Sequence, residues 1–282
     1  MSFDPVAYKQ AITAEWQRTA EGWHRWIPAI NAWLAEATEL MLDGAGVKEG
    51  ARVIDIASGD GGQSLAAAAR VGASGEVLAT DIAPAFVALA NGVARRMGLS
   101  QLRAEVMDAE SLSLPDGRFD GAISRLGLMY LPDLAQGLSE IKRVLRPGGR
   151  LAAVVFTTPE KSPFFSVPAK LVREARGLPP PPPEQPGPFF LGAPGRFAEG
   201  LARAGFREVR EDLVKAPLRF ETAKECVRWR REASGTIHHM LRGLDEAGKE
   251  AIWRDIERAM EAYETPQGFE SPCELLVCSA VK

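Results

Sequence analysis

The stretch Val53-Ile54-Asp55-Ile56-Ala57-Ser58-Gly59-Asp60-Gly61-Gly62 decides the fold of this 282-residue chain. It begins as a short β-branched run, which predicts a buried strand, and ends in a glycine-rich turn. An alanine-rich segment with helical character, residues 63–71, follows directly. Glycine lets a backbone approach a ligand closely, and open parallel sheets bind ligands at the carboxyl ends of their strands. The stretch therefore predicts a ligand-binding turn between a first strand and a first helix.

The residues downstream repeat this pattern. Between residues 51 and 157 we expect strand and helix to alternate five times. After the first strand and helix, the expected strands are 76–80, 102–107, 119–124 and 151–157, and the expected helices are 84–97 and 133–145. This pattern predicts an α/β fold, a Rossmann-like, doubly wound and mostly parallel sheet with helices on both faces. With later strands at 207–214 and 274–281, the sheet would have seven strands.

The flanking segments predict a helical lid. Residues 8–43 read as helical, with a kink at Pro28 and an end at Gly44 and Gly46. After residue 158 the pattern becomes irregular, and five consecutive prolines, 179–183, indicate a stiff connector. A short helix is expected at 195–204, and residues 222–264 are mostly helical. We therefore divide the chain into an N-terminal helical lid (1–46), a binding core (47–157), a loop and helix insertion with a strand (158–217), a helical cap (218–265) and a returning final strand (266–282).

Composition limits the classes of function. Hydrophobic residues make up 46% and charged residues 25%, which is typical of a globular protein and excludes intrinsic disorder. The net charge of −3 disfavours a nucleic-acid binder, which is usually strongly basic. We see no apolar run long enough to span a membrane and no secretory signal. Three cysteines are too few for a disulfide framework, so we expect a cytoplasmic protein.

Acidic residues follow three of the expected strands. Asp55 precedes the glycines, which suits a cationic amino-acid group better than a pyrophosphate, and the spacing excludes a phosphate-binding P-loop. Asp81 ends the second strand, where a carboxylate can accept both hydroxyls of a ribose. Asp108 and Glu110 end the third strand, where an acid can accept a hydrogen bond from an exocyclic amine such as that of adenine.

These blocks carry a resemblance to a known family. The run Asp55-Ile-Ala-Ser-Gly-Asp-Gly resembles motif I of the class I S-adenosylmethionine-dependent methyltransferases. Four further blocks resemble later motifs in the same order: 79–82, 106–116, 119–125 and 144–151. The nearest subgroup in appearance is the UbiE-like type of small-molecule methyltransferase, from ubiquinone and menaquinone biosynthesis. Ala57 departs from the pattern, because many members carry glycine there.

The resemblance implies S-adenosyl-L-methionine as the cofactor and assigns roles to its binding residues. Asp81 would hold the ribose diol, Ile82 would pack on adenine, and Asp108 with the Ala109 amide would read the adenine ring. Gly61 would allow close approach of the chain. Ser124 and Arg125 would lie near the sulfonium, and Arg125 is a candidate catalytic residue. The methionine part would be lined by Asp55, Ala57, Ser58 and Gly59.

The acceptor is expected to be a small organic molecule. Ser124-Arg125-Leu126-Gly127 replaces the D/N-P-P-Y/F motif of adenine-N6 and glutamine methyltransferases, which argues against those targets. A lid built from the N-terminal segment and the late insertions would enclose an aromatic, quinone-like or polyketide-like compound for O- or C-methylation. The candidate substrate-binding residues are aromatic side chains of the lid and the insertions: Trp23, Trp26, Phe189 and Trp229.

The candidate bases are the three histidines, His24, His238 and His239. His238 and His239 are adjacent, so on a helix they point about 100° apart and cannot both face one site. No cysteine and histidine cluster with zinc spacing occurs, and paired acids for magnesium have no signature here, so no metal site is predicted.

Other functions stay open at this point. One alternative is a methyltransferase fold that keeps bound S-adenosylmethionine but catalyses a decarboxylation or a cyclisation. Another is N-methylation of a small amine. A dinucleotide-dependent dehydrogenase and a scaffold with a vestigial site are further alternatives. The expected partner is a small-molecule acceptor, with no nucleic acid and no membrane span, and a homodimer is compatible with these observations.

Overall fold

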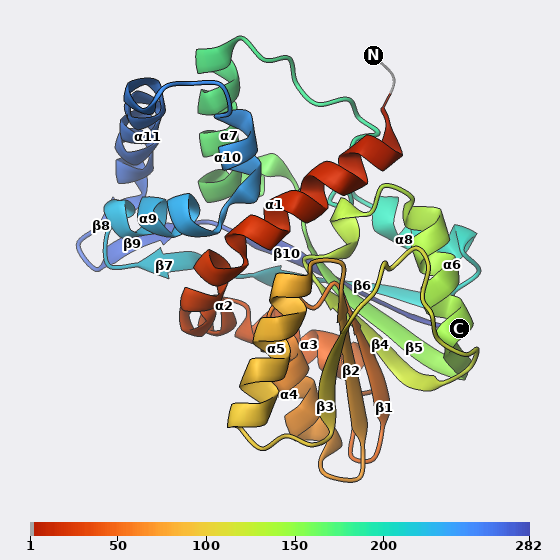
Figure 1. Cartoon of the computed structure of the whole chain (residues 1–282). Helices are drawn as coiled ribbons and strands as arrows, with labels where there is room; N and C mark the ends of the chain where they lie inside the picture. Colours follow the sequence, from red (N-terminus) through yellow and green to blue (C-terminus); the bar gives the residue numbers. More distant parts are fainter. Residues whose placement is uncertain (1–2) are drawn as a thin grey trace.

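The computed structural model describes residues 3–282, and its centre is a seven-stranded sheet (Figure 1). The strand order is β3-β2-β1-β4-β5-β10-β6, which confirms the predicted doubly wound sheet. The strands, in spatial order, are β3 (Leu102–Val106), β2 (Glu76–Asp81), β1 (Arg52–Ile56), β4 (Phe119–Arg125), β5 (Leu145–Phe156), β10 (Glu274–Val281) and β6 (Arg207–Lys215).

Strand β1 lies at the point where the strand order reverses. It pairs in parallel with β2 on one side and with β4 on the other. Successive strands then run outward in both directions, so the loops after β1 and β4 separate and leave a crevice at their carboxyl ends. Strand β10 pairs antiparallel with both β5 and β6, which makes it the exception in an otherwise parallel sheet.

Helices cover both faces of the sheet (Figure 1). On one face lie α3 (Ala35–Gly44), α4 (Gly62–Val71) and α5 (Pro84–Arg96), and on the other lie α6 (Leu134–Val144) and α8 (Arg196–Arg203). The strands between these layers are buried on both sides, and the side chains of Val53, Ile54 and Ile56 are fully inaccessible. Their continuous apolar runs reflect this double burial.

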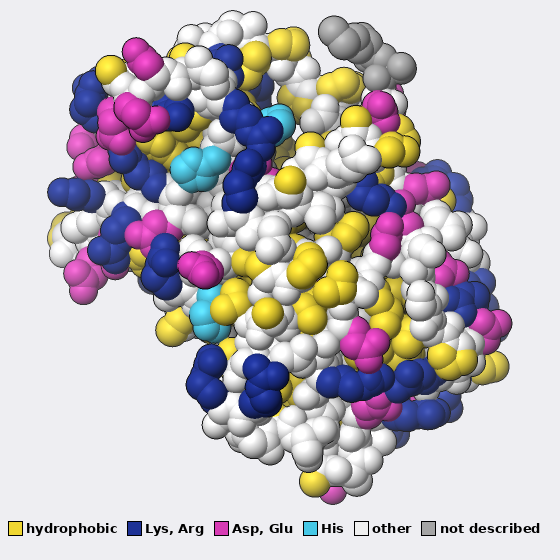
Figure 2. Space-filling model, viewed as in Figure 1, with side chains coloured by type: hydrophobic (Ala, Val, Ile, Leu, Met, Phe, Trp, Pro, Cys, Tyr) yellow, Lys and Arg dark blue, Asp and Glu magenta, His cyan; other side chains and the backbone are white. Residues whose placement is uncertain are grey.

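A second layer of helices sits above the carboxyl edge of the sheet. Its members are α7 (Pro163–Arg176), α9 (Ala223–Ala233), α10 (Gly235–Met240) and α11 (Glu246–Met260), together with a small sheet of β7 (Leu218–Phe220), β9 (Gly268–Ser271) and β8 (Glu264–Thr265). We call this layer the cap. In Figure 2, acidic and basic side chains are interspersed on its visible face.

Helix α1 (Pro5–Arg25) crosses diagonally between the cap and the core (Figure 1). Asp4 caps its start by accepting hydrogen bonds from the amides of Val6 and Ala7. Gly22 fixes where it crosses α9, because a Cβ there would lie 1.9 Å from the carbonyl oxygen of Glu232. Only glycine therefore permits this close crossing, which sets α1 over the edge of the sheet.

The structure departs from the sequence predictions at several boundaries. The predicted N-terminal helix is three helices, because the chain also breaks at Trp26 and Leu34 around α2 (Ile27–Trp33). A loop rather than a helix joins β3 to β4, so strand and helix do not alternate five times. Strand β5 begins at Leu145, where a helix was expected to end, and β9 falls within the segment assigned to the final strand. Within residues 3–282, no helix is long and apolar enough to cross a membrane.

Candidate active site

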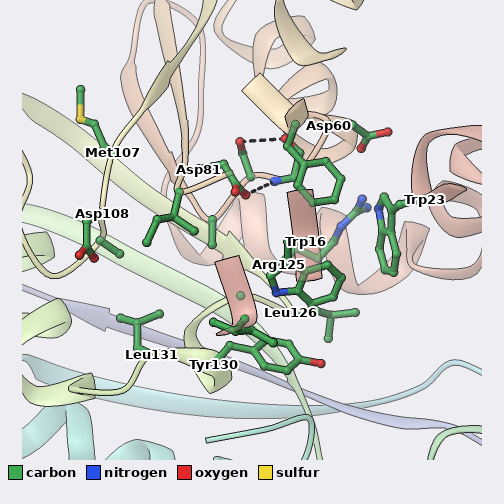
Figure 3. Close-up of a pocket in the computed structure, with 18 of the residues that line it drawn as sticks. Trp16, Trp23, Asp60, Asp81, Met107, Asp108, Arg125, Leu126, Tyr130 and Leu131 are labelled. Atoms are coloured by element: carbon green, nitrogen blue, oxygen red, sulfur yellow. Dashed lines mark hydrogen bonds between the residues drawn. The ribbon is translucent and has the colours of Figure 1, made fainter. Parts of the chain in front are cut away.

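A cleft opens at the carboxyl ends of β1 to β4, beneath α1 (Figure 3). It encloses about 970 Å³ of empty space, part of which is open to solvent. Its walls come from α1, from the loops after the four strands and from the segment after β4. The lining residues include Lys9, Trp16, Trp23, Ala57, Ser58, Gly59, Asp60, Gln63, Asp81, Ile82, Phe86, Met107, Asp108, Ala109, Glu110, Arg125, Leu126 and Tyr130.

The turn after β1 has the left-handed backbone that its glycines allow. Gly59 and Gly61 have φ of 58° and 85°. Ala57 also has a left-handed φ of 52°, and Leu126 has a φ of 59°. Non-glycine residues rarely adopt this conformation, and such strain concentrates at functional sites. Ala57 and Leu126 both line the cleft, so two strained residues face the same space.

Asp81 at the end of β2 faces the cleft and orders the turn opposite. Its Oδ2 accepts a hydrogen bond from the Gly59 amide and its Oδ1 accepts one from the Ala83 amide, both at 2.9 Å. Each carboxylate oxygen can accept two hydrogen bonds, so both oxygens retain acceptor capacity for a ligand. Burial raises the pKa of Asp81 to about 6, against the effect of these amides.

Asp55 points away from the cleft and into helix α4. It accepts hydrogen bonds from Gln63 Nε2 at 3.1 Å and from Ser64 Oγ at 2.5 Å, and it is fully buried. Burial raises its pKa to about 7, although both bonds lower it. Asp55 therefore fixes the start of α4 and the turn before it, rather than lining the cleft as the resemblance implied.

The raised pKa of Asp55 predicts a specific pH dependence of stability. The folded chain holds the Asp55 proton between about pH 4 and pH 7, where the unfolded chain has released it. Stability from this group is therefore present at acid pH and lost as the pH rises. We expect Asp55→Asn to gain stability relative to wild type across this window, by at most about 4 kcal/mol. Urea unfolding of both proteins from pH 4.5 to 8 measures this, and a pH-independent difference would contradict it.

Asp108 and Glu110, after β3, are bridged by Lys9 from α1. The Lys9 ammonium lies 2.7 Å from Asp108 Oδ2 and 2.5 Å from Glu110 Oε2. Asp108 also accepts a hydrogen bond from the Glu110 amide. These ion pairs tie the lid helix to the edge of the sheet and occupy one side of the Asp108 carboxylate. We call this contact the Lys9 latch.

Arg125 at the end of β4 is a buried cation beside the turn. Its guanidinium donates to Thr38 Oγ1 and Asn31 Oδ1, each at 3.0 Å. It also packs against Gly62, where a Cβ would lie 2.8 Å from Nη2. Burial lowers its pKa to about 10, while the charges of Asp55 and Asp60 raise it. Arg125 therefore stays protonated at neutral pH and compensates the buried acids around the turn.

His24 and Asp60 form a hydrogen-bonded pair, in which Asp60 lines the cleft and His24 lies outside its lining. His24 Nδ1 lies 2.8 Å from Asp60 Oδ2. Asp60 is 3% exposed and lines the cleft, whereas the His24 side chain is 29% exposed. Burial raises the pKa of Asp60, against the His24 bond that lowers it. A carboxylate on one imidazole nitrogen sets the tautomer and leaves the other nitrogen to take up a proton.

The structure brings together part of the set of residues predicted from the sequence. Of the predicted residues, those that line the cleft are Trp23, Ala57, Ser58, Gly59, Asp81, Ile82, Asp108, Ala109 and Arg125. Gly61 and Ser124 lie behind this surface, and Ser124 Oγ is buried without a hydrogen-bond partner. His238 and His239 are exposed on α10, and His238 Nε2 bonds to the Arg231 carbonyl. Neither of these two histidines lines the cleft.

Three of the predicted substrate-binding aromatics pack inside the cap and core. Trp26 lies against Phe220 and donates to Glu232 Oε2 at 2.9 Å. Phe189 packs on Phe156, and Trp229 packs among Trp33, Phe164 and Phe220. None of the three lines the cleft.

Two side chains at the cleft, those of Tyr130 and Lys9, were not predicted from the sequence, whereas Trp16 was among the expected pocket aromatics. Tyr130 follows β4, and its ring packs edge-on against that of Trp16, with the two ring centres 5.5 Å apart. Trp16 in turn meets Trp23 at 6.1 Å, so aromatic rings from α1 and from the β4 loop form one wall. The helical spacing of Trp16 and Trp23 was a usable signal, because both fall on the face of α1 that covers the cleft. Nothing in the sequence around Lys9 or Tyr130 marked either residue.

Part of the chain is similar in sequence to known proteins. Residues 54–153 match the model of a methyltransferase domain. Demethylmenaquinone methyltransferase of Thermus thermophilus is 36% identical over 132 residues, which are 47% of this chain and 57% of that protein. The matches to the first curated relatives span about half of the length of each of those proteins.

Solved structures share the fold over most of the chain. The YcgJ protein of Bacillus subtilis covers 88% of this chain with a TM-score of 0.59 and 17% identity, and 98% of that chain is covered. The [4+2]-cyclase SpnF covers 94% with a TM-score of 0.56 and 18% identity, and 95% of that chain is covered. At this identity the likeness concerns the fold alone.

Proposed function

Because residues 54–153 match the model of a methyltransferase domain, we propose that this protein is a class I methyltransferase that transfers a methyl group from S-adenosyl-L-methionine to a small organic acceptor. The observation that carries the proposal is the hydrogen bond that Asp81 accepts from the Gly59 amide. This bond holds a carboxylate beside the glycine turn, and both residues line the cleft. The likeness of part of the chain to a C-methyltransferase of ubiquinone and menaquinone biosynthesis favours a carbon as the methylated atom, and an acceptor oxygen is the second candidate.

The residues present fit this cofactor. When bound, S-adenosylmethionine supplies an electrophilic methyl group on a positively charged sulfur. Asp81 would accept from the two ribose hydroxyls, and Ile82 would pack on the adenine. Asp108 would accept from the adenine amine. Arg125 would face the carboxylate of the methionine part, while Asp60 keeps the surroundings of that end negative and suited to a cation.

His24 is the best-placed base among the three histidines. Asp60 holds its Nδ1, which leaves Nε2 to accept a proton from an acidic acceptor group. His24 sits on α1 one residue after Trp23, which lines the cleft. We propose that the His24–Asp60 pair takes the proton of the acceptor hydroxyl or, in C-methylation, the proton that the ring carbon loses after it has received the methyl group. The protein provides the remaining acceleration by holding the reactants together.

Replacing His24 with glutamine tests this role. We expect kcat to fall about 100-fold, the lower end of what a positioned base contributes, with the affinity for S-adenosylhomocysteine changed less than threefold. His239→Gln is the matched control, because His239 is exposed on α10 and, unlike His24, is not hydrogen-bonded to a residue that lines the cleft. Equal losses of kcat in the two variants would remove His24 from the mechanism.

A methyl-transfer assay tests the proposed function itself. Wild-type protein is incubated with S-adenosylmethionine and a panel of phenols, quinols and small amines, and the release of S-adenosylhomocysteine is measured. Acceptor-dependent release is the expected result. Binding of S-adenosylmethionine with turnover of an acceptor but without release of S-adenosylhomocysteine would instead indicate a non-methylating reaction.

The Lys9 latch predicts slow exchange of the cofactor. Lys9 shares the Asp108 carboxylate that the adenine amine would use, and it holds α1 across the cleft. Each partly exposed ion pair is worth up to about 1 kcal/mol, so Lys9→Met should speed dissociation of S-adenosylhomocysteine roughly fivefold. Stopped-flow tryptophan fluorescence can follow this, since Trp16 and Trp23 line the cleft. Lys170→Met on the exposed face of α7 is the control, and unchanged rates for Lys9→Met would exclude the latch.

A further inference from the structure

Arg230 on α9 is a buried cation with no acidic partner. Its side chain belongs to a residue that is 4% exposed, and its Nε has no hydrogen-bond acceptor. Among residues 3–282, no carboxylate lies within ion-pair distance of it. The groups that influence its charge are the Cys226 thiol and the Tyr130 phenol, and burial lowers its pKa to about 10. Arg230 is thus still protonated at neutral pH in a site without a counter-ion.

The surroundings of Arg230 are aromatic and do not replace a counter-ion. Its guanidinium lies 4.0 Å from the centre of the Phe165 ring and 5.9 Å from that of Trp229. Cation–π contacts offset only part of the cost of burying a charge. Trp229 Nε1 is a second buried donor without an acceptor. Two neighbouring N–H donors therefore lack the same thing, an acceptor oxygen.

Arg125 provides a contrast within the same chain. It is equally buried, but it donates to Asn31 and Thr38 and has Asp55 and Asp60 close by. Its charge is accounted for by the structure of the turn. The charge of Arg230 has no such compensation within the described chain. A hydrogen-bond acceptor for Arg230 would therefore have to come from another molecule.

Tyr130 connects Arg230 to the cleft. It lines the cleft, and its phenol and the Arg230 guanidinium each shift the other's pKa. Burial keeps the pKa of Tyr130 above its usual range, so its hydroxyl is neutral and can donate. Figure 3 shows this hydroxyl pointing away from Asp108 and Leu131, on the side of the cleft opposite the adenine-reading acids.

We propose that Arg230 binds an anionic oxygen group of the acceptor, and that the natural acceptor is an aromatic compound carrying a carboxylate or an ionised enol. This proposal rests on the proposed methyltransferase function. A planar guanidinium matches a carboxylate or a delocalised enolate in two parallel hydrogen bonds. Phe165, whose ring lies against the Arg230 guanidinium, would contact the aromatic frame of the same molecule. Arg230 does not itself line the described cleft, and it would act as a specificity-determining residue next to the Tyr130 side of that cleft.

The test compares charged probes with neutral probes of the same shape. Binding of 4-hydroxybenzoate and 4-hydroxycinnamate, and of the two corresponding amides, is measured by calorimetry with saturating S-adenosylhomocysteine. The proteins are wild type, Arg230→Met, Arg230→Lys and the exposed control Arg258→Met. We expect wild type and the control to bind at least one acid tenfold or more tightly than its amide. Arg230→Met should lose this preference, and Arg230→Lys should keep part of it.

A second readout needs no ligand. Removing an unsatisfied buried charge should raise the Tm of ligand-free Arg230→Met above that of wild type, whereas a structural arginine would leave it lower. Wild type that binds S-adenosylhomocysteine but prefers neither acid, or a lower Tm for Arg230→Met, would overturn the anion site and leave the proposed function standing. Failure of wild type to bind S-adenosylhomocysteine would instead reject the proposed function, and the Tm comparison would still decide the role of Arg230.

Discussion

Replacing Asp81 with asparagine is expected to weaken the binding of S-adenosylhomocysteine about 100-fold. The carboxylate of Asp81 accepts from the amides of Gly59 and Ala83 and has acceptor capacity left on both oxygens for a ribose diol. An amide has only one acceptor oxygen, so its NH₂ group would face either a backbone N–H or a ligand hydroxyl. Losing a hydrogen bond to a charged group costs about 1.5–3 kcal/mol, and 2.7 kcal/mol corresponds to 100-fold.

Calorimetric titration of wild type and Asp81→Asn with S-adenosylhomocysteine measures this effect. Asp255→Asn is the matched control, because Asp255 is exposed on α11 and its one ion pair is with Arg258. The free energy of unfolding of both variants should be checked by urea titration, since Asp81 also holds the turn after β1. An affinity of Asp81→Asn within threefold of wild type, in a folded protein, would remove Asp81 from cofactor binding.

Replacing Arg125 with methionine is expected to destabilise the protein by about 3–5 kcal/mol at pH 8. Arg125 lies near the buried acids of the turn, and its removal leaves Asp55 and Asp60 without a nearby buried cation. The loss should shrink towards pH 5.5, because burial raises the pKa of Asp55 to about 7 and the protonated acid needs no compensation. This sign is the reverse of the stabilisation expected for Arg230→Met, which removes a cation that lacks an acidic partner.

Urea unfolding of wild type and Arg125→Met at pH 5.5 and pH 8 tests whether the loss of stability depends on pH. Arg258→Met serves as the control for loss of a positive charge, since Arg258 is exposed. A loss of stability at Arg125 that is equal at both pH values would show that packing against Gly62, rather than charge, is what Arg125 contributes.

The sequence was most informative where one local signal served one structural purpose. The turn between Ala57 and Gly62 was predictable because only certain backbone angles let a strand turn into a helix so tightly, and glycine marks those angles. Asp81 and Asp108 were predictable because strand ends recur at the same edge of a parallel sheet. The departure at Ala57 was visible too, and the structure gives its consequence, a left-handed alanine packed near Gly127.

The acceptor side of the cleft could not be predicted in the same way. It is built by contacts between segments far apart in the chain, such as α1 with the β4 loop and α9 with α7. Trp26 and Trp229 looked like substrate contacts because large aromatics are common in pockets, but the same side chains also fill the interior of a cap. Whether Arg230 has a counter-ion depends on the packing of three separate elements, and a single sequence does not report it.

The orientation of the Asp55 side chain toward α4 shows a further limit of prediction from the sequence. A strand-end acid before a glycine turn reads the same whether it faces the ligand or supports the turn from behind. Its orientation depends on Gln63 and Ser64, which lie on the first turns of α4 and offer it donors. The sequence identified the residue, and only the packing of α4 on β1 assigned it a positioning role.

Calorimetric titration of the wild-type protein with S-adenosylmethionine tests the central claim most directly. The cleft between Asp81, Asp108 and Arg125 predicts saturable binding with one site per chain, and this binding should be weakened about 100-fold in Asp81→Asn. Absence of binding heat together with an unchanged Tm in the presence of excess S-adenosylmethionine and of S-adenosylhomocysteine would contradict it.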